Sequence, residues 1–325
     1  MRDTYLDTSK AVLIFLVVLG HFLERMVGWN DPIAHTLLGT IYFVHMPAFI
    51  FISGLLFKDK NWLKNILFFI SLYVPFQILF PAFDAIWSGN MQINRNLFER
   101  PYWILWYLLG MMVWTLLTHF LIKTKFAVWI ALILALCVGL SPWNNYQYSV
   151  GRIFTFLPFF VIGAVYGKAI IQSIRSIRYA EWFGVLIFIG IFSLVYLSQI
   201  NQFWLYGSLS YQQLKVSAFE GTLIRLGCMA VSSLGIFAIF AIVKQCQSRF
   251  LKLGINTLPV YLLHGFVVIL ISKYWKLESH ILIELMICFG LSLLTCWILQ
   301  QQSFDMLLRK MSLWLMKPVE RLGLK

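Results

Sequence analysis

Histidines within long apolar runs are the side chains of this sequence whose type and placement best suit chemistry. His21 and His45 each lie in an apolar run long enough to cross a membrane, and His264 lies in the middle of another. Ionisable groups in hydrocarbon are costly, so their presence favours a functional site; a hydrogen-bonded core histidine is the alternative for each. Imidazoles transfer protons or bind metals, but these three lie on separate runs without a ligand spacing. We therefore expect proton-transfer chemistry and no metal site.

The first apolar run carries a stripe of polar residues. Asp3, Asp7 and Lys10 follow at helical spacing, and Glu24 lies three residues after His21. Lys10 and His21 are eleven residues apart. At about 100° per residue this is within roughly 20° of three full turns, so both lie on one face, about 16 Å apart. A polar stripe in a membrane helix must face protein or water, which predicts an interior cavity beside it. A purely structural network of Asp7, Lys10 and His21 is the alternative.

The composition of the chain is that of an integral membrane protein. Of its 325 residues 60% are hydrophobic and 12% charged, and the mean hydropathy is +0.80. The apolar runs are continuous and not alternating, which favours helices over a barrel. We predict an all-α, polytopic protein with about ten transmembrane helices. They lie near residues 8–28, 34–57, 62–82, 102–122, 126–141, 151–171, 181–199, 220–244, 255–273 and 280–302. Residues 1–302 form one predicted membrane domain, and residues 303–325 form a tail.

The basic residues indicate how these helices are oriented. The net charge of +13 suggests a nucleic-acid partner, but Lys and Arg occur in short clusters between apolar runs, so we expect none. With a cytoplasmic N-terminus, 18 of the 26 Lys and Arg fall on the inner side and 8 on the outer side. The positive-inside rule therefore predicts that both termini are cytoplasmic. The tail mixes apolar and basic residues, which is typical of an amphipathic helix on the inner leaflet.

Two predicted outer connections, residues 83–101 and 200–219, are long and rich in aromatic and amide side chains. Such side chains suit sugar hydroxyls, but an aromatic belt at the membrane interface is the alternative. The five cysteines show no CxxC spacing, so we expect neither a disulfide nor a metal role for them. The connections are therefore the sequence's only hint of a sugar ligand at this stage.

Five motifs occur in order between residues 3 and 266. The first joins Asp7 and Lys10 to His21, and the second is FVHMPAFIFISG, which contains His45. An aromatic segment around Trp106, the run GRIFTFLPFFVIG and the run LGINTLPVYLLHGF follow. In these motifs the sequence resembles the membrane acyltransferase-3 family, especially its branch of polysaccharide and fucose O-acetylases. Where the family usually has arginine this chain has Lys10, which keeps the charge but loses bidentate contacts.

The resemblance implies transfer of an acyl group, most often acetyl from acetyl-CoA, to a sugar hydroxyl of a glycan or glycolipid. A sugar hydroxyl is too weakly acidic to attack a thioester unaided, so a neutral histidine is expected as general base. We assign this role to His21. His45 is expected to line the tunnel or to carry a transient acyl group, as is Ser53. His264 and Tyr261 are expected to hydrogen-bond the thioester oxygen or the acceptor.

The remaining polar residues are expected to bind the two substrates. The donor side is assigned to four residues: Asp7, Lys10, Ser53 and Tyr261. Lys10, oriented by Asp7, lies where the phosphates of acetyl-CoA would dock at the inner face. The acceptor side is assigned to three residues: Glu24, Arg152 and Trp106. Arg152 is expected to contact a phosphate or an acidic sugar, and Glu24 either the acceptor or His21, with plain solvation as the alternative.

Two other classes of protein are considered. A glycolipid transporter or flippase would use the same polar stripe to pass a hydrophilic group, but no internal repeat stands out. A non-catalytic scaffold has no need of histidines at mid-membrane depth. The resemblance also places the protein in a bacterial inner membrane, with the bilayer, acetyl-CoA and the glycan as partners. Some relatives carry a C-terminal esterase-like domain, which is absent here, so the membrane domain alone is expected to deliver the acyl group.

Overall fold

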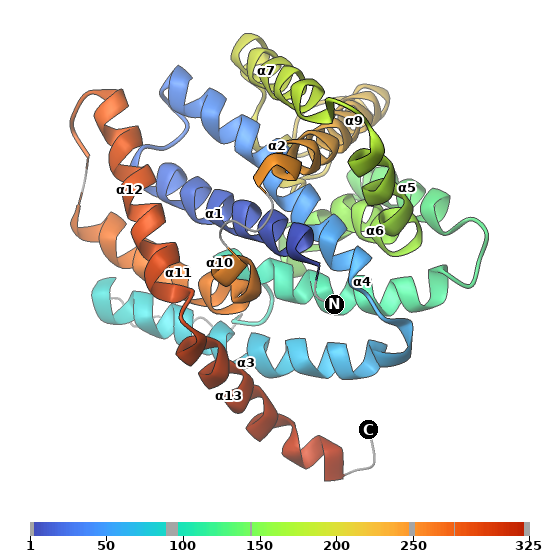
Figure 1. The fold of residues 1–325 in the computed structure, drawn as a ribbon, viewed down its shortest axis with the longest axis vertical. Helices are drawn as coiled ribbons and strands as arrows, with labels where there is room; N and C mark the ends of the chain where they lie inside the picture. The colour runs from blue at the N-terminus through green and yellow to red at the C-terminus, as the bar shows by residue number, and fades with distance from the viewer. Residues whose placement is uncertain (1–2, 89–96, 144, 247–250, 276, 322–325) are drawn as a thin grey trace.

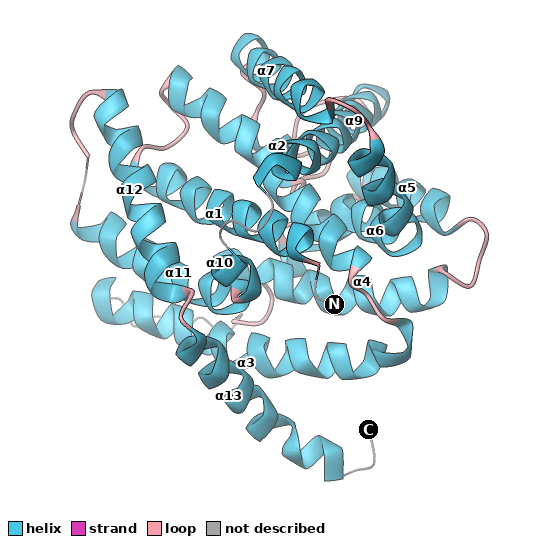
Figure 2. Cartoon of the chain, viewed as in Figure 1, coloured by secondary structure: helices cyan, strands magenta, loops and turns pink. Residues whose placement is uncertain are grey.

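The computed structural model describes residues 3–88, 97–143, 145–246, 251–275 and 277–321, and every regular element in them is helical (Figure 1, Figure 2). The predicted all-α fold is thus confirmed. The α-helices are α1 (Thr4–Met26), α2 (Pro32–Leu55), α3 (Trp62–Ser88), α4 (Trp106–Leu121), α5 (Ala127–Cys137), α6 (Val150–Ser176), α7 (Ala180–Ser198), α8 (Gln202–Tyr206), α9 (Ala218–Val243), α10 (Leu251–Ile255), α11 (Thr257–Tyr274), α12 (Ile281–Leu299) and α13 (Gln302–Arg321). Short 3-10 turns include Trp103–Leu105 before α4 and Val138–Leu140 after α5.

Within the described residues, nine helices are long and apolar enough to cross a membrane. The protein is therefore a multi-pass membrane protein. The predicted span that falls short is residues 126–141, where α5 has 11 residues before its 3-10 turn. At 1.5 Å per residue, α5 covers about 16 Å, roughly half of the ~30 Å hydrocarbon core. Ser141 and Pro142 end this apolar run before it reaches the length of a span.

α1 lies in the middle of the bundle and contacts α2, α9, α10, α11 and α12 (Figure 1). Asp3 caps it: the carboxylate accepts hydrogen bonds from the backbone N–H groups of Tyr5 at 3.0 Å and Leu6 at 3.4 Å. Because of this cap the helix begins at Thr4, earlier than the predicted residue 8. The polar stripe therefore runs along one continuous helix.

α2 and α6 approach each other closely at two glycines, Gly54 and Gly163. A methyl group added at Gly54 would overlap the carbonyl of Phe160, and one added at Gly163 would overlap the carbonyl of Phe51. Small residues let two helix backbones come this near inside a membrane. The contact fixes the height of α2, which carries His45, against α6.

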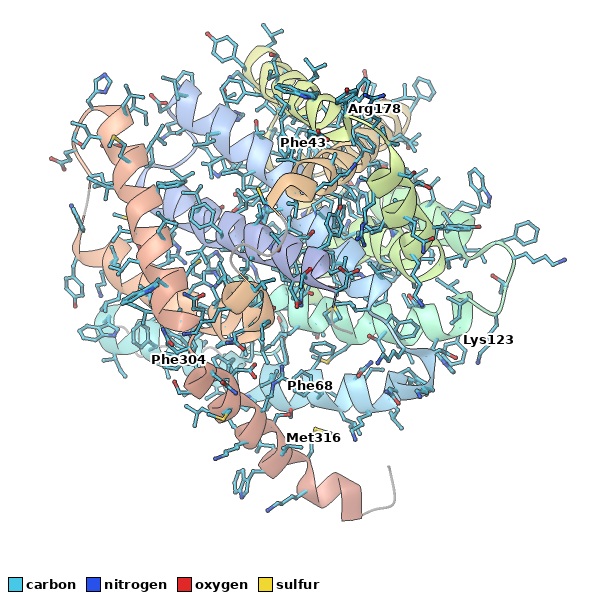
Figure 3. All side chains as sticks on the ribbon, in the orientation of Figure 1. Phe43, Phe68, Lys123, Arg178, Phe304 and Met316 are labelled. Atoms are coloured by element: carbon cyan, nitrogen blue, oxygen red, sulfur yellow. The ribbon has the colours of Figure 1, made fainter. Side chains whose placement is uncertain are left out.

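Large apolar side chains are exposed on the outer helices, as expected where a protein meets lipid. Leu197 of α7 is 81% exposed and Trp297 of α12 is 63% exposed. Phe43 of α2 is 2% exposed and lies inside the bundle, whereas Lys123, just after α4, lies at its edge (Figure 3). The bundle thus has a packed interior and an apolar perimeter.

The C-terminal residues form the helix predicted for the tail. α13 lies against α3, where the hydroxyl oxygens of Ser71 and Ser312 are 2.6 Å apart. Its place on the inner leaflet and the boundary at residue 302 stay predictions. The second predicted outer connection contains α8. Residues 89–96 of the first connection and residues 322–325 of the tail lie outside the described residues.

Candidate active site

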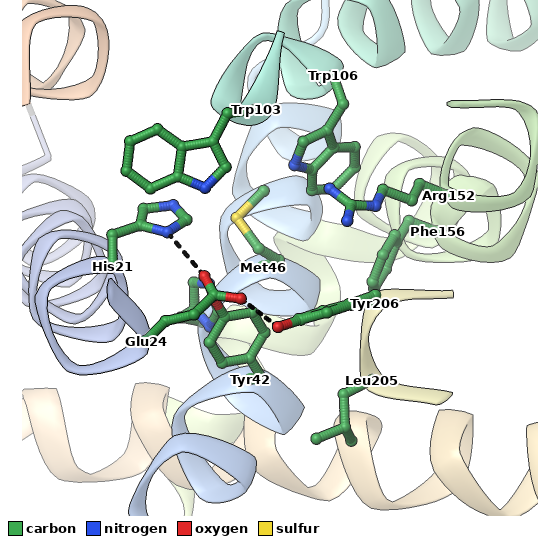
Figure 4. A pocket seen from close by; sticks show the side chains of 11 residues that line it. His21, Glu24, Tyr42, Met46, Trp103, Trp106, Arg152, Phe156, Leu205 and Tyr206 are labelled. Carbon is green, nitrogen blue, oxygen red and sulfur yellow. Dashed lines mark hydrogen bonds and ion pairs between the residues drawn. The ribbon is translucent and has the colours of Figure 1, made fainter. Parts of the chain in front are cut away.

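A pocket lies between α1, α2, α6, α8 and the turn that leads into α4. Its empty space, including the mouth, is about 490 Å³. Most of its lining is aromatic or ionisable: His21, Glu24, Tyr42, His45, Met46, Trp103, Trp106, Arg152, Phe156, Leu205 and Tyr206 (Figure 4). Five predicted site residues from separate parts of the chain therefore meet here: His21, Glu24, His45, Trp106 and Arg152.

Glu24 is fixed in this pocket by two phenols. Tyr42 donates a hydrogen bond to Glu24 Oε2 at 2.7 Å, and Tyr206 donates one to Oε1 (Figure 4). Oε2 also lies 3.5 Å from Nδ1 of His21, one turn earlier on α1. Burial and the neighbouring Glu24 carboxylate hold the pKa of Tyr206 well above its usual value, so this phenol remains a donor. The fixed carboxylate favours a proton on Nδ1 of His21.

Aromatic rings enclose the imidazole of His21. The ring of His264 stacks on it, with centroids 5.4 Å apart and planes at 20°. The indole of Trp103 meets it edge-on at 4.7 Å, and Arg25 places its guanidinium 4.4 Å from the centre of that indole ring. The orientation of His21 is thus set by α11 and by the segment before α4 as well as by its own helix.

Gln77 of α3 clamps the segment that carries Trp103. Its amide donates to the backbone carbonyls of Leu97 at 2.5 Å and Arg100 at 2.9 Å, and accepts from the N–H of Tyr102 at 2.8 Å. The Gln77 side chain is buried, with 1% of the residue exposed. Trp103 has a φ of 34°, a left-handed conformation that is unfavourable for a residue with a side chain. The clamp therefore holds Trp103 where its own backbone preference would not.

His45 and His264 share one local geometry. In each ring Nδ1 contacts the carbonyl four residues earlier: Ile41 at 2.7 Å and Val260 at 2.9 Å. A carbonyl oxygen only accepts, so each neutral ring carries its proton on Nδ1 and offers Nε2 as an acceptor. Nε2 of His264 is buried and has no hydrogen-bond partner among the described residues. Neutral His264 can therefore accept a hydrogen bond from a substrate but cannot donate one to a thioester oxygen.

A line of polar side chains continues from His264 away from the pocket. The rings of Tyr261 and His264 are 6.3 Å apart, and the ring of Tyr107 lies 5.2 Å from that of Tyr261. Tyr107 Oη is 2.7 Å from Ser53 Oγ. Tyr261 donates its hydroxyl proton to the carbonyl of Ile104, so in this arrangement it also lacks a donor for the thioester. Ser53, which is half-buried, and Tyr261, which is buried, belong to one line of polar side chains but not to the pocket itself.

Lys10 lies on α1 before Gly20, and Ser53 lies on α2 after Ile41. α1 and α2 run antiparallel with Gly20 beside Ile41, so Lys10 and Ser53 lie toward the same end of the two helices. Nζ of Lys10 forms a 2.7 Å ion pair with Asp7 Oδ1, and the Asp7 side chain is 6% exposed. That Lys10, Ser53 and Tyr261 together bind the donor stays a prediction.

Arg152 occupies the opposite side of the pocket from His21, among aromatic rings (Figure 4). Its guanidinium carbon lies 5.4 Å from the ring centre of Trp106, 5.9 Å from that of Tyr146 and 5.3 Å from that of Tyr206. Such contacts attract a cation. Because Tyr206 also donates to Glu24, one tyrosine ring separates the positive end of the pocket from its negative end.

Comparison with known proteins identifies the family. The family model described as an acyltransferase domain, of the acyltransferase-3 type, matches residues 3–301. The chain belongs to the acyltransferase-3 family. It is 24% identical to nodulation protein NolL of Sinorhizobium fredii, over 93% of this chain and 90% of the relative. It is also 24% identical to nodulation protein NolL of Mesorhizobium japonicum, over 86% of this chain and 82% of the relative. No solved structure matches the chain significantly.

As a member of the acyltransferase-3 family, the protein is a membrane O-acyltransferase, which confirms the enzyme class expected from its motifs. Sequence reasoning missed Tyr42, Tyr206 and Gln77. Tyr42 lies three residues before His45, hence on a neighbouring part of the same helix face, and Tyr206 lies in the aromatic second connection. Gln77 is an amide inside an apolar run, which is itself a signal of an interior polar contact. No group of three or more potential metal ligands occurs in the part of the chain that the structure describes.

Proposed function

We propose that this acyltransferase moves an acetyl group from acetyl-CoA to a sugar hydroxyl in the pocket, with His21 as general base. The observation that carries the proposal is the His21–Glu24 pair beside an aromatic pocket. A carboxylate that faces Nδ1 keeps Nε2 as the basic nitrogen and stabilises the imidazolium that forms. Family membership favours this enzyme over the glycolipid transporter considered from the sequence.

In the proposed reaction, Nε2 of His21 takes the proton of the sugar hydroxyl as its oxygen attacks the thioester carbon. A C–O bond forms and the C–S bond breaks. The imidazolium then returns the proton to the departing thiolate, so that free coenzyme A and an acetyl ester are the products. Neither His45 nor Ser53 needs to carry the acyl group, although His45 lies in the pocket and could hold the acceptor through Nε2.

The donor is proposed to enter from the cytoplasmic side. The polyanionic end of acetyl-CoA cannot cross hydrocarbon, and Lys10 supplies a cation toward the same end of the α1–α2 pair as Ser53. Asp7 orients the Lys10 amine. This route requires both termini in the cytoplasm, as the distribution of Lys and Arg predicts. A bacterial inner membrane is proposed from the family resemblance.

The acceptor is proposed to enter from the outer side, where α8 and the segment around Trp103 contribute to the pocket. Flat aromatic rings and fixed polar groups are the usual means of holding a sugar, which has apolar faces and hydroxyl edges. Trp106 and Tyr206 supply such rings, and Glu24 supplies a hydrogen-bond acceptor near His21.

The test is mass spectrometry of surface glycans from cells that express the chain, its His21→Asn variant or its His280→Asn variant. His280 is an exposed N-cap of α12, and Asn also caps a helix, so it is a matched control. We expect His21→Asn to lower acetylation by at least about 10²-fold, the usual contribution of a general base. The control should keep it. Full acetylation by His21→Asn would refute the role of His21, and loss of folded protein would indicate a structural role instead.

A further inference from the structure

The Arg152 guanidinium has no ion-pair or hydrogen-bond acceptor among the described residues, although it lines the pocket. A guanidinium carries five N–H donors, and its contacts here are with the faces of Trp106, Tyr146 and Tyr206. Ring faces hold the cation but leave those donors unused. Within the residues that the structure describes, the site therefore has a positioned cation without an anionic partner.

The surroundings of Arg152 add to its positive potential. It lies in the first turn of α6, a helix of 27 residues, where the backbone dipole is positive. Ser149, the N-cap of α6, makes no side-chain capping hydrogen bond. Neutral aromatic walls also screen the charge less than water would. These features together favour a negatively charged ligand.

We propose that the acyl acceptor carries an anionic group, a phosphate or a carboxylate, that binds Arg152 while the acylated hydroxyl meets His21. This inference rests on the proposed function for the identity of the acceptor as a sugar. The charges of the pocket set the orientation of the acceptor. The Glu24 carboxylate repels an anionic group from the His21 end of the pocket, and Arg152 attracts that group to the opposite end. The side chain of Tyr206 contacts both Glu24 and Arg152, so the two ends lie close together and the charge belongs on the acylated sugar or on its direct neighbour.

Two sources supply this chemistry: the phosphate that links a sugar to a lipid carrier, or the carboxylate of an acidic sugar. Both groups present two oxygens that can accept parallel hydrogen bonds from the N–H groups of a guanidinium. A neutral sugar would leave the Arg152 donors unused and would gain nothing from the charge.

The test measures binding to purified protein by calorimetry, with glucose 1-phosphate, methyl glucuronide and methyl glucoside as probes. We expect the dissociation constant of at least one charged probe to be at least about tenfold lower than that of the neutral probe. A charge-assisted hydrogen bond contributes this much. Preference for the phosphate indicates a carrier-linked sugar, and preference for the carboxylate indicates an acidic sugar. Equal binding of the three probes, or none by any, overturns the inference.

Matched variants tie the preference to Arg152. Arg152→Gln should abolish it, and Arg152→Lys should keep part of it because the charge remains. Arg100→Gln is the control: its guanidinium also stacks on Tyr146, at 4.1 Å, but it is exposed and does not line the pocket. A preference that survives in Arg152→Gln refutes the assignment. Binding is read without acyl transfer, so failure of acetylation with this preference intact would count against the proposed function alone.

Discussion

Replacing Glu24 by Gln tests the proposed base most directly, because it removes a charge and little else. The amide keeps the size of the side chain and an oxygen that accepts from Tyr42 or Tyr206. It loses the carboxylate that lies 3.5 Å from His21 Nδ1. Two opposite charges about 4 Å apart interact by about 4 kcal/mol at an effective dielectric constant of 20, which bounds the lost stabilisation of the imidazolium from above. Half of that bound already corresponds to about 30-fold in rate.

We therefore expect Glu24→Gln to lower kcat by about 30-fold to 10³-fold, with the KM for acetyl-CoA little changed. The assay is release of free thiol from acetyl-CoA by purified protein in the presence of acceptor glycolipid. Glu220→Gln is the control, since Glu220 is an exposed carboxylate in the capping box of α9, where Gln also fits. If Glu24→Gln keeps kcat within about threefold of the native value, the carboxylate does not stabilise a charged His21 in the rate-limiting step and the reasoning fails.

Three further substitutions test the donor route, the clamp and the helix packing. Lys10→Met removes the ion partner of a buried carboxylate and should reduce the amount of folded protein. Asp7→Asn with Lys10→Met should restore folding yet raise the KM for acetyl-CoA about tenfold or more, whereas an unchanged KM excludes Lys10 from donor binding. Gln77→Leu leaves two carbonyls and one N–H of the partly buried segment without their partner. It should lower the free energy of unfolding by about 2 kcal/mol and reduce kcat through Trp103. Unchanged denaturation and kcat would show that the clamp is dispensable. Gly163→Ala should lower the midpoint of thermal unfolding because the added methyl overlaps the carbonyl of Phe51. Gly190→Ala is the control, since an added methyl there meets no atom within 4 Å. Equal midpoints for the two variants would argue against the close α2–α6 contact.

The sequence predicted those features that follow from one helix at a time. The shared face of Lys10, His21 and Glu24 depends only on the helical period, and all three residues do lie on α1. The all-α fold likewise followed from continuous apolar runs. Over the predicted span of residues 126–141 the structure has an apolar helix and 3-10 turn, Ala127–Leu140, which is shorter than the other candidate spans. Helix periodicity and composition therefore carried the fold.

Contacts between elements could not be predicted in this way. The partners of Glu24 come from α2 and α8, and Tyr206 lies 182 residues away in the sequence. The position of Gln77 in an apolar run signals an interior polar contact, but its partners are backbone atoms, which the sequence does not single out. The stacking of His264 on His21 depends on how α11 packs against α1. Each of these needs the tertiary arrangement, although single polar residues in apolar runs mark where to look.

The stacking of two imidazoles constrains the proposed reaction. The ring centroids of His21 and His264 are 5.4 Å apart, so two positive charges at this distance would repel each other. The pair therefore holds one charge at most during the acyl transfer. Once His21 has taken the hydroxyl proton, a second protonation of His264 is disfavoured, and the lone pair on Nε2 of His264 stays available to the acceptor. In the proposed reaction the proton on His21 passes to the thiolate, which couples departure of coenzyme A to renewal of the base.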